Sequence, residues 1–152
     1  MSSIEYFKRQ AKLLLKDYNS AKEHNFDQKA VSYEEPQEHF DIRNVFQKAN
    51  KQIGEDLTLM NAQHLVARIS EFDKWETLIH ASELQREIGA LKLNAYKIGM
   101  DPSLIDEARE LVMHELFADF AVDNSGNIVY TDEDELKIWK RVLFDLIEMT
   151  YF

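Results

Sequence analysis

The chain has 152 residues, of which 45% are hydrophobic, 4 are glycine and 2 are proline, and this composition excludes collagen-like, low-complexity and disordered classes of protein. Cysteine is absent, which excludes disulfides, thiol nucleophiles and sulfur-ligated zinc, and makes the reducing cytoplasm the expected location. Twenty-eight acidic against 18 basic residues give a net charge of −10, which opposes contact with nucleic acid phosphates and anionic membranes.

The N-terminal part of the chain predicts one helix followed by a long surface loop. Apolar residues from Ile4 to Tyr18 repeat with the period of a helix, and Ser3 can cap it. Charged residues interrupt these apolar positions, so we expect neither a signal peptide nor a membrane span here. Residues 19–40 lose the helical period and contain Pro36, which together predict a loop.

The middle of the chain predicts two helices. The first begins at Asp41 and ends at Gly54, because glycine readily adopts the left-handed conformation that terminates a helix. The second begins after Thr58, a favourable N-cap, and its apolar residues between Leu59 and Ile69 recur at helical spacing. We expect each helix to bury its apolar face.

A short turn then leads to more helical sequence. Asp73 and Glu76 have the spacing of a capping box, and apolar residues continue at helical spacing as far as Ile98. This stretch predicts either one unbroken helix or two helices, the second of which would start near Ser82 with Gln85 as its box partner.

The C-terminal third predicts two helices joined by a short β element. Asp101 and Pro102 are a favourable cap and first residue for a helix whose buried positions extend to Phe117. Residues 120–130 contain two β-prone runs on either side of a turn, which predicts a small β-hairpin or an extended turn. A final helix begins at 131–132.

These elements predict a mainly α fold. We expect a single helical domain over residues 1–152, built as a bundle of about six helices with the small β element near residues 120–130. A chain of this length buries roughly two thirds of its unfolded surface, so one compact core is the default expectation. The sequence contains no internal repeat and no linker-like segment between domains.

The negative charge is concentrated towards the C-terminus. Residues 101–152 contain 13 acidic and 4 basic residues, whereas residues 1–100 have a net charge of only −1. Two interpretations remain open, a solvated surface of uneven charge and an acidic face that docks a basic partner. Under the second interpretation, the partner-binding residues are the acids in and before the first turn of the last helix, namely Asp119, Asp123, Asp132, Glu133, Asp134 and Glu135.

Candidate cofactor sites are weak. The segment DNSGNI has the spacing of a calcium-binding loop, but Ala121 occupies the position of the first ligand, so we expect a structural turn. Glu107, Glu110 and His114 share a helical stripe but match no known metal-ligand motif. Motifs for nucleotide binding or nucleophilic catalysis are absent from the sequence. We therefore expect no cofactor and no metal site.

DNA binding is also not expected. The helices across residues 58–83 have the dimensions of a helix-turn-helix. Their second helix, however, has Asp73, Glu76 and Glu83 against Lys74 alone, and these carboxylates would repel phosphates.

One segment matches a recurring pattern. The matching residues are Ala62, Gln63, Val66, Ala67, Phe72, Trp75 and Leu78. With them, the segment resembles a bacterial helical pattern, AQxxVAxxxGFxxWxxL, that is found beside ankyrin repeats, in glyoxalase-related domains and in small uncharacterised proteins. Glu71 stands where that pattern has glycine. The resemblance implies a helical hairpin held by Phe72 and Trp75, and it implies no activity.

The sequence favours a non-enzymatic, intracellular protein-binding module that docks a basic protein through its acidic C-terminal surface. An immunity, antitoxin or inhibitor role fits such a chain, because neutralising a cationic partner needs complementary charge rather than chemistry. Two alternatives remain open. A metal-dependent hydrolase or small-ligand-binding protein would use a pocket near Glu107, Glu110 and His114. A self-associating scaffold would pair the basic first helix of one copy with the acidic last helix of another.

Overall fold

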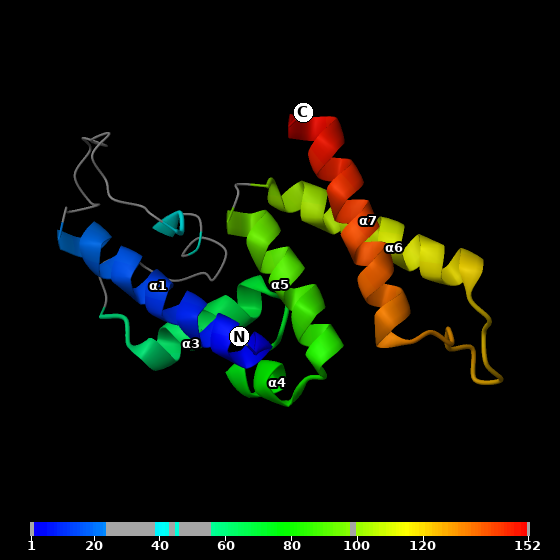
Figure 1. Cartoon of the computed structure of the whole chain (residues 1–152), viewed down its shortest axis with the longest axis horizontal. Coiled ribbons are helices and arrows are strands. Elements are labelled where there is room, and N and C mark those ends of the chain that lie inside the picture. Colours follow the sequence, from blue (N-terminus) through cyan, green and yellow to red (C-terminus); the bar gives the residue numbers. More distant parts are fainter. Residues whose placement is uncertain (1, 24–38, 43–44, 46–55, 98–99, 152) are drawn as a thin grey trace. The chain divides into compact units, whose positions relative to one another are not determined.

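The computed structural model describes residues 2–23, 39–42, 45, 56–97 and 100–151, and this part of the chain is mainly α-helical (Figure 1). No helix within it combines the length and the uninterrupted apolar run that crossing a membrane requires. The high helical content of the described residues confirms the predicted mainly α class. The described helices are α1 (Ser3–Glu23), α3 (Leu59–Ile69), α4 (Trp75–His80), α5 (Glu83–Lys97), α6 (Pro102–Asp119) and α7 (Asp132–Tyr151).

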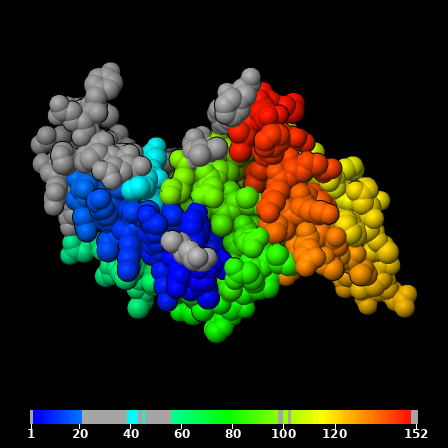
Figure 2. Space-filling model, in the orientation of Figure 1, coloured from blue at the N-terminus to red at the C-terminus, as the bar shows by residue number. Residues whose placement is uncertain are grey.

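The chain forms two compact units, Met1–Ala81 and Ser82–Phe152, and each is described by itself. In the first unit, α1 packs against α3 and α3 packs against α4. In the second unit, α7 packs against both α5 and α6, and Figure 2 shows the side chains of α7 lying against those of α6. The expectation of one domain over residues 1–152 stays a prediction.

The first helix is longer than the sequence predicted. Its N-cap is Ser2 rather than Ser3, because the Ser2 hydroxyl accepts the Glu5 N–H at 3.2 Å and the Glu5 carboxylate accepts the Ser2 N–H at 3.3 Å. The helix also continues to Glu23, so the predicted loop over residues 19–40 is helical in its first part. Residues 24–38 lie outside the described part of the chain.

A buried carboxylate ties the segment after this gap to α1. Asp17 is 2% exposed, and its Oδ2 atom accepts the backbone N–H groups of His39 at 2.9 Å and Phe40 at 2.8 Å. Beyond them, Ile42 and Val45 are helical and fully buried, as the helix predicted from Asp41 requires. The rest of that predicted helix, including its end at Gly54, lies outside the described residues.

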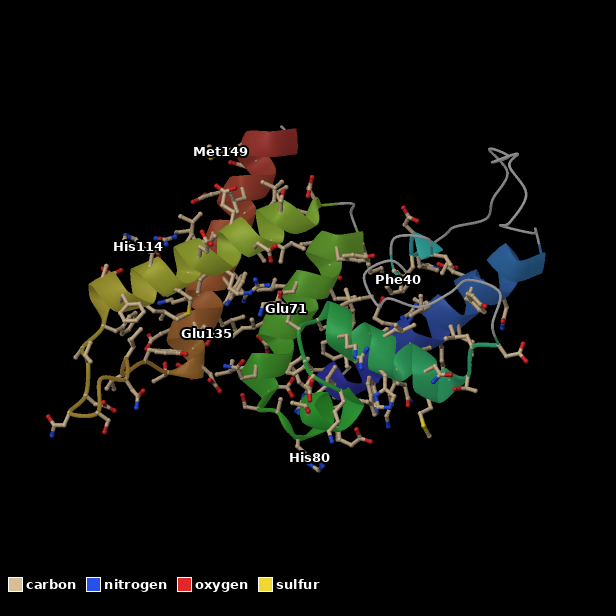
Figure 3. All side chains as sticks on the ribbon, turned by 180° about the vertical axis from the view of Figure 1, so that it is seen from behind. Phe40, Glu71, His80, His114, Glu135 and Met149 are labelled. Atoms are coloured by element: carbon tan, nitrogen blue, oxygen red, sulfur yellow. The ribbon has the colours of Figure 1, made fainter. Side chains whose placement is uncertain are left out.

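The turn between α3 and α4 has a left-handed residue. The Phe72 N–H donates to the Ala67 carbonyl at 2.8 Å and the Glu71 N–H donates to the Arg68 carbonyl at 3.0 Å, which together form the Schellman arrangement that ends a helix. Glu71 has φ +69°, a conformation in which glycine avoids the Cβ clash of other residues. Figure 3 shows Glu71 at this turn. Phe72 then meets Phe7 of α1 edge to face, with ring centroids 6.5 Å apart.

The stretch predicted as one or two helices is two, α4 and α5. Ser82 caps α5, because its hydroxyl accepts the Gln85 N–H at 3.1 Å. The predicted Asp73–Glu76 box is wrong, since the N-cap of α4 is Lys74 and this residue makes no side-chain capping bond.

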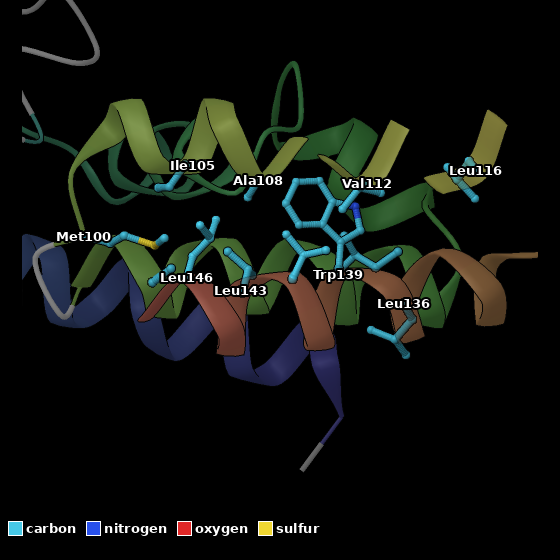
Figure 4. Close-up of a cluster of buried hydrophobic side chains, with 12 residues drawn as sticks. Met100, Ile105, Ala108, Val112, Leu116, Leu136, Trp139, Leu143 and Leu146 are labelled. Atoms are coloured by element: carbon cyan, nitrogen blue, oxygen red, sulfur yellow. The ribbon is translucent and has the colours of Figure 1, made fainter. Parts of the chain in front are cut away.

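The second unit encloses a hydrophobic core in which Trp139 of α7 is 3% exposed. The core packs α7 against α5 and α6 (Figure 4), and its members are Ile88, Ala95, Met100, Ile105, Ala108, Val112, Leu116, Leu136, Trp139, Val142, Leu143 and Leu146. Phe117 was predicted to be buried but is 60% exposed. Leu116 already occupies the inward position of that turn, so its neighbour on the helix points outward.

The β-hairpin predicted near residues 120–130 is not supported, because the described residues contain no strand. The segment instead has one isolated antiparallel bridge between Val122 and Ile128. Asp123 closes the turn by accepting the N–H groups of Ser125 and Asn127, both at 2.9 Å. Val122 is 53% exposed, and with a single bridge and no third strand among the described residues the β-prone runs do not extend into a sheet.

Candidate functional site

Asp132, the first residue of α7, ties that helix to the start of α5. Its Oδ2 atom accepts the Ser82 hydroxyl at 2.7 Å and its Oδ1 atom accepts the Gln85 amide at 2.8 Å. These hydrogen bonds, that from Ser82 first, lower the pKa of Asp132. Both carboxylate oxygens therefore have partners within the second unit, so the main role of Asp132 is structural.

Asp134 forms a capping box with Thr131 at the start of α7. Its Oδ2 atom accepts the Thr131 N–H at 3.0 Å and the Thr131 hydroxyl at 2.9 Å. The Thr131 hydroxyl in turn accepts the Asp134 N–H at 3.2 Å. These bonds lower the pKa of Asp134. Because both hydrogen bonds to the carboxylate use Oδ2, the Oδ1 atom of Asp134 makes neither of them.

Glu135 interacts with a phenol, that of Tyr130, and with an ammonium group, that of Lys92. It hydrogen-bonds to Tyr130, whose pKa is raised first by burial and then by the charge of Glu135. Its charge also acts on Lys92 of α5, although burial is the larger effect and lowers the pKa of Lys92. The Lys92 ammonium lies 4.4 Å from the centroid of the Trp139 ring, within the range of a cation–π interaction. Glu135 thus faces partners inside its own unit.

A cavity of about 380 Å³ lies between the end of α6 and the first half of α7. We call it the acidic cavity, because three carboxylates and two cations line it beside two apolar side chains. It brings two of the predicted binding residues, Asp119 and Asp134, to one site. Its lining residues are Glu115, Asp119, Phe120, Asp134, Lys137, Ile138 and Arg141.

An ion pair crosses the acidic cavity. Arg141 of α7 pairs with Glu115 of α6, and this hydrogen bond is the main reason that the pKa of Arg141 is raised. Asp119 and Asp145 raise it further through their charges. Glu115 is thereby neutralised, which leaves Asp119 and Asp134 with Lys137 as the remaining charges of the lining.

A second cavity of about 260 Å³ adjoins the first. It shares Asp134 and Lys137 with the acidic cavity and adds Glu133, Leu136 and Lys140. Three predicted residues, Asp119, Glu133 and Asp134, therefore line these adjoining hollows. The other three do not line either one, since Asp123 closes a turn, Asp132 ties two helices together and Glu135 faces Tyr130 and Lys92.

Sequence reasoning missed the residues that complete the acidic cavity. Glu115 and Asp119 are four apart on α6, and Lys137 and Arg141 are four apart on α7. Residues four apart share a helical face, so two stripes of opposite charge were a signal that these helices face each other there. The apolar lining by Phe120 and Ile138 had no comparable signal.

No group of three or more acidic or histidine side chains able to hold a metal ion is found among the described residues. Glu107, Glu110 and His114, the stripe considered above, are exposed on α6, and Figure 3 shows His114 projecting from that helix. The alternative of a metal-dependent hydrolase therefore gains no support from this stripe.

Comparisons with family models, with curated proteins and with solved structures gave no match. Any functional conclusion therefore rests on the residues of this chain.

Proposed function

We propose that the protein is a non-enzymatic, cytoplasmic protein-binding module that docks a basic protein segment at the acidic cavity. An inhibitor, immunity or antitoxin role fits this activity, since each acts by occupying a cationic partner. The sequence predicts a binding surface made of Asp119, Asp123 and the four acids that open α7. Because both carboxylate oxygens of Asp132 have partners within the second unit, we propose that the surface is centred on the acidic cavity, with Asp119, Asp134 and the adjoining Glu133.

The lining of the acidic cavity suits a lysine or arginine side chain of a partner. Such side chains bury an aliphatic stem on apolar surface while the charged head stays near polar groups. Phe120 and Ile138 offer apolar surface, and Asp119 and Asp134 offer carboxylates to the head. An arginine is favoured over a lysine, because its planar guanidinium binds carboxylates through two hydrogen bonds.

The charge of the whole second unit supports a basic partner. Residues 82–152 contain 15 acidic and 7 basic residues, a net charge of −8. A field of one sign accelerates the encounter with a partner of the opposite sign and discourages other partners. Because Lys137 would repel a cation locally, Asp119, Asp134 and the surrounding carboxylates must supply the attraction.

Exposed apolar side chains adjoin this site in the sequence. Phe117 is 60% exposed on one side of Asp119 and Phe120, and Val122 is 53% exposed on the other. Large exposed apolar side chains beside a charged site are typical of protein interfaces, whose centres bury aromatic residues within a polar rim. They favour a protein partner over a free cation or a polyamine.

The observation that carries the proposal is the placement of Asp119 and Asp134 beside Phe120 and Ile138 in one cavity. To test it, we would titrate the full chain with a labelled, helical, arginine- and leucine-containing peptide and measure fluorescence anisotropy. We expect saturable binding that weakens several-fold between 50 and 300 mM salt, because exposed charges are screened.

The decisive comparison uses two doubly substituted chains with the same change in charge. Asp119→Asn with Glu133→Gln should weaken peptide binding about tenfold, a change that corresponds to about 1.4 kcal/mol. Glu107→Gln with Glu148→Gln, which lie outside the cavities, should weaken it less than twofold. Equal losses in the two chains would mean that only net charge matters, and binding that ignores salt would overturn the proposal.

A further inference from the structure

A third cavity, smaller than the two described above, lies in the first unit, on the α3–α4 hairpin. It has a volume of about 210 Å³, and it is lined by Asn61, His64, Leu65, Arg68 and Lys74. We call it the donor cavity, because its four polar side chains all offer hydrogen-bond donors. This character is opposite to that of the acidic cavity.

The donor character of His64 is set by the backbone of α4. Its Nδ1 atom accepts the Trp75 N–H at 3.2 Å. An Nδ1 atom that accepts a hydrogen bond carries no proton, so the neutral ring has its proton on Nε2. His64 therefore presents an N–H donor at its second nitrogen.

The donor character of Asn61 is set in the same way by the cap of α3. Its Oδ1 atom accepts the Thr58 hydroxyl at 2.8 Å and the Thr58 N–H at 3.3 Å. The acceptor end of the amide is thus occupied, and the remaining polar group is the NH₂ donor.

Arg68 and Lys74 are the two cations of the donor cavity. Arg68 is the last basic residue of α3 and Lys74 precedes α4, and both are exposed. Among the residues that the structure describes, no ion pair joins either side chain to an acid. Elsewhere, Arg86, Arg109 and Arg141 do pair with acids, so the pairing of arginines is otherwise common in this acidic chain.

We propose that the donor cavity binds a phosphate-sized oxyanion, either free or as a phosphomonoester. Two cationic side chains and two neutral donors line it, and charge-assisted hydrogen bonds of the kind they could donate to an oxyanion are the strong ones in proteins. A volume of 210 Å³ has room for a tetrahedral anion, since one water molecule takes about 30 Å³ in the liquid. The site is independent of the proposed function, because it lies in the other unit and attracts ligands of the opposite charge.

The negative charge of the chain helps to distinguish specific from nonspecific phosphate binding. A net charge of −10 opposes nonspecific binding of anions. Asp73 and Glu76, which are exposed and close in sequence to Lys74, add to this opposition. Saturable phosphate binding would therefore require the local arrangement of donors.

The test is a titration of the ¹⁵N-labelled full chain with inorganic phosphate at constant ionic strength, followed by NMR. We expect saturable shifts of the Trp75 amide and of the His64 ring signals in the millimolar range. Arg68→Gln with Lys74→Gln should weaken binding at least tenfold. Lys74→Gln alone, expected to weaken it several-fold, serves if the double substitution disturbs folding.

The matched control removes one arginine and one lysine from the same unit. Arg9→Gln with Lys12→Gln changes two exposed residues of α1 that do not line the donor cavity, and it should leave phosphate binding unchanged. Absence of saturation in the wild-type chain, or equal losses in the two double variants, would overturn the proposal. Acetate binding as tightly as phosphate would overturn it as well.

A further pair of titrations identifies the source of the anion. O-phosphoserine that binds more tightly than inorganic phosphate would support the proposal with a phosphomonoester ligand. The reverse order would support it with the free ion as ligand.

Discussion

The Nδ1 atom of His64 in α3 lies 3.2 Å from the backbone nitrogen of Trp75, the first residue of α4. A side chain from one helix thus supplies the acceptor that the N-cap residue of the next helix, Lys74, does not supply. Losing a capping acceptor typically costs about 1 kcal/mol. His64→Ala should therefore lower the free energy of unfolding by about 1 kcal/mol, as measured by urea denaturation. Asp73→Ala, at the position that sequence spacing favoured as a cap, should lower it by less than about 0.5 kcal/mol.

Glu71 offers a test of backbone strain. A residue with a Cβ atom in the left-handed conformation costs about 1–2 kcal/mol, whereas glycine does not meet that clash. Part of this gain is offset by the greater freedom of glycine in the unfolded chain. Glu71→Gly should be more stable than Glu71→Ala by about 1 kcal/mol in thermal or urea unfolding. Equal stabilities of the two variants would show that the turn is not left-handed in solution.

Asp132 links stability to pH. Its pKa is lower in the folded chain than in the unfolded chain because Ser82 and Gln85 donate to its carboxylate. The unfolded chain therefore binds more protons just below the ordinary pKa, so this stabilisation is complete at neutral pH and is lost as the pH falls through the folded pKa. Asp132→Ala should lower stability by about 1 kcal/mol at pH 7 and by less at pH 3. Glu133→Ala removes a neighbouring carboxylate that takes part in neither of these hydrogen bonds, so it should change stability little at either pH.

Lys92 also makes stability rise with pH, but in the alkaline range. Burial lowers its pKa in the folded chain, so the charged form is disfavoured on folding. The unfolded chain then binds more protons between the folded and the ordinary pKa, and stability rises as the pH approaches 10.5. Lys92→Met keeps the apolar stem without the charge, so it should be at least as stable as the wild type at pH 7. A clear loss of stability would mean that the contact of Lys92 with Trp139 outweighs its burial.

Two residues of α7, Trp139 and Met149, should contribute very differently to the stability of the second unit. Trp139 is 3% exposed in that core, whereas Met149 is 83% exposed. Truncating a buried aromatic residue leaves a cavity and costs about 3–5 kcal/mol. Trp139→Ala should lose about that much stability in urea denaturation, and Met149→Ala should stay within about 0.5 kcal/mol of the wild type.

Much of the helical pattern could be predicted because helix caps are local. Thr58, Ser82, Asp101 and Thr131 each cap a helix where the sequence suggested one, since a cap involves residues two or three positions apart. The cap of α4 could not be predicted, because its acceptor His64 comes from another helix. The exposure of Phe117 could not be predicted for the same reason. Helical spacing was compatible with a buried Phe117, and only the packing of α6 against α7 decides that it is exposed.

The candidate site was only partly predictable for the same reason. Charge density alone indicated Asp119 and Asp134. It did not reveal that Asp132 is occupied by residues of α5, or that Arg141 reaches across to Glu115. Those pairings join residues far apart in the chain, and local patterns do not encode them. The donor cavity is a similar case, because its four polar residues look unremarkable until the hairpin folds.

The hydrogen bond between Ser82 and Asp132 joins residues 50 positions apart, and this separation bears on when the contact forms during folding of the second unit. Bringing such distant positions together lowers chain entropy before any contact compensates for it. Ser82 and Asp132 can meet only after α6 and the turn that follows it have brought α7 back against α5, so we expect this contact to form late in folding. A contact that forms after the folding transition state slows unfolding but does not affect folding. Removing it should therefore speed unfolding while leaving the rate of folding almost unchanged.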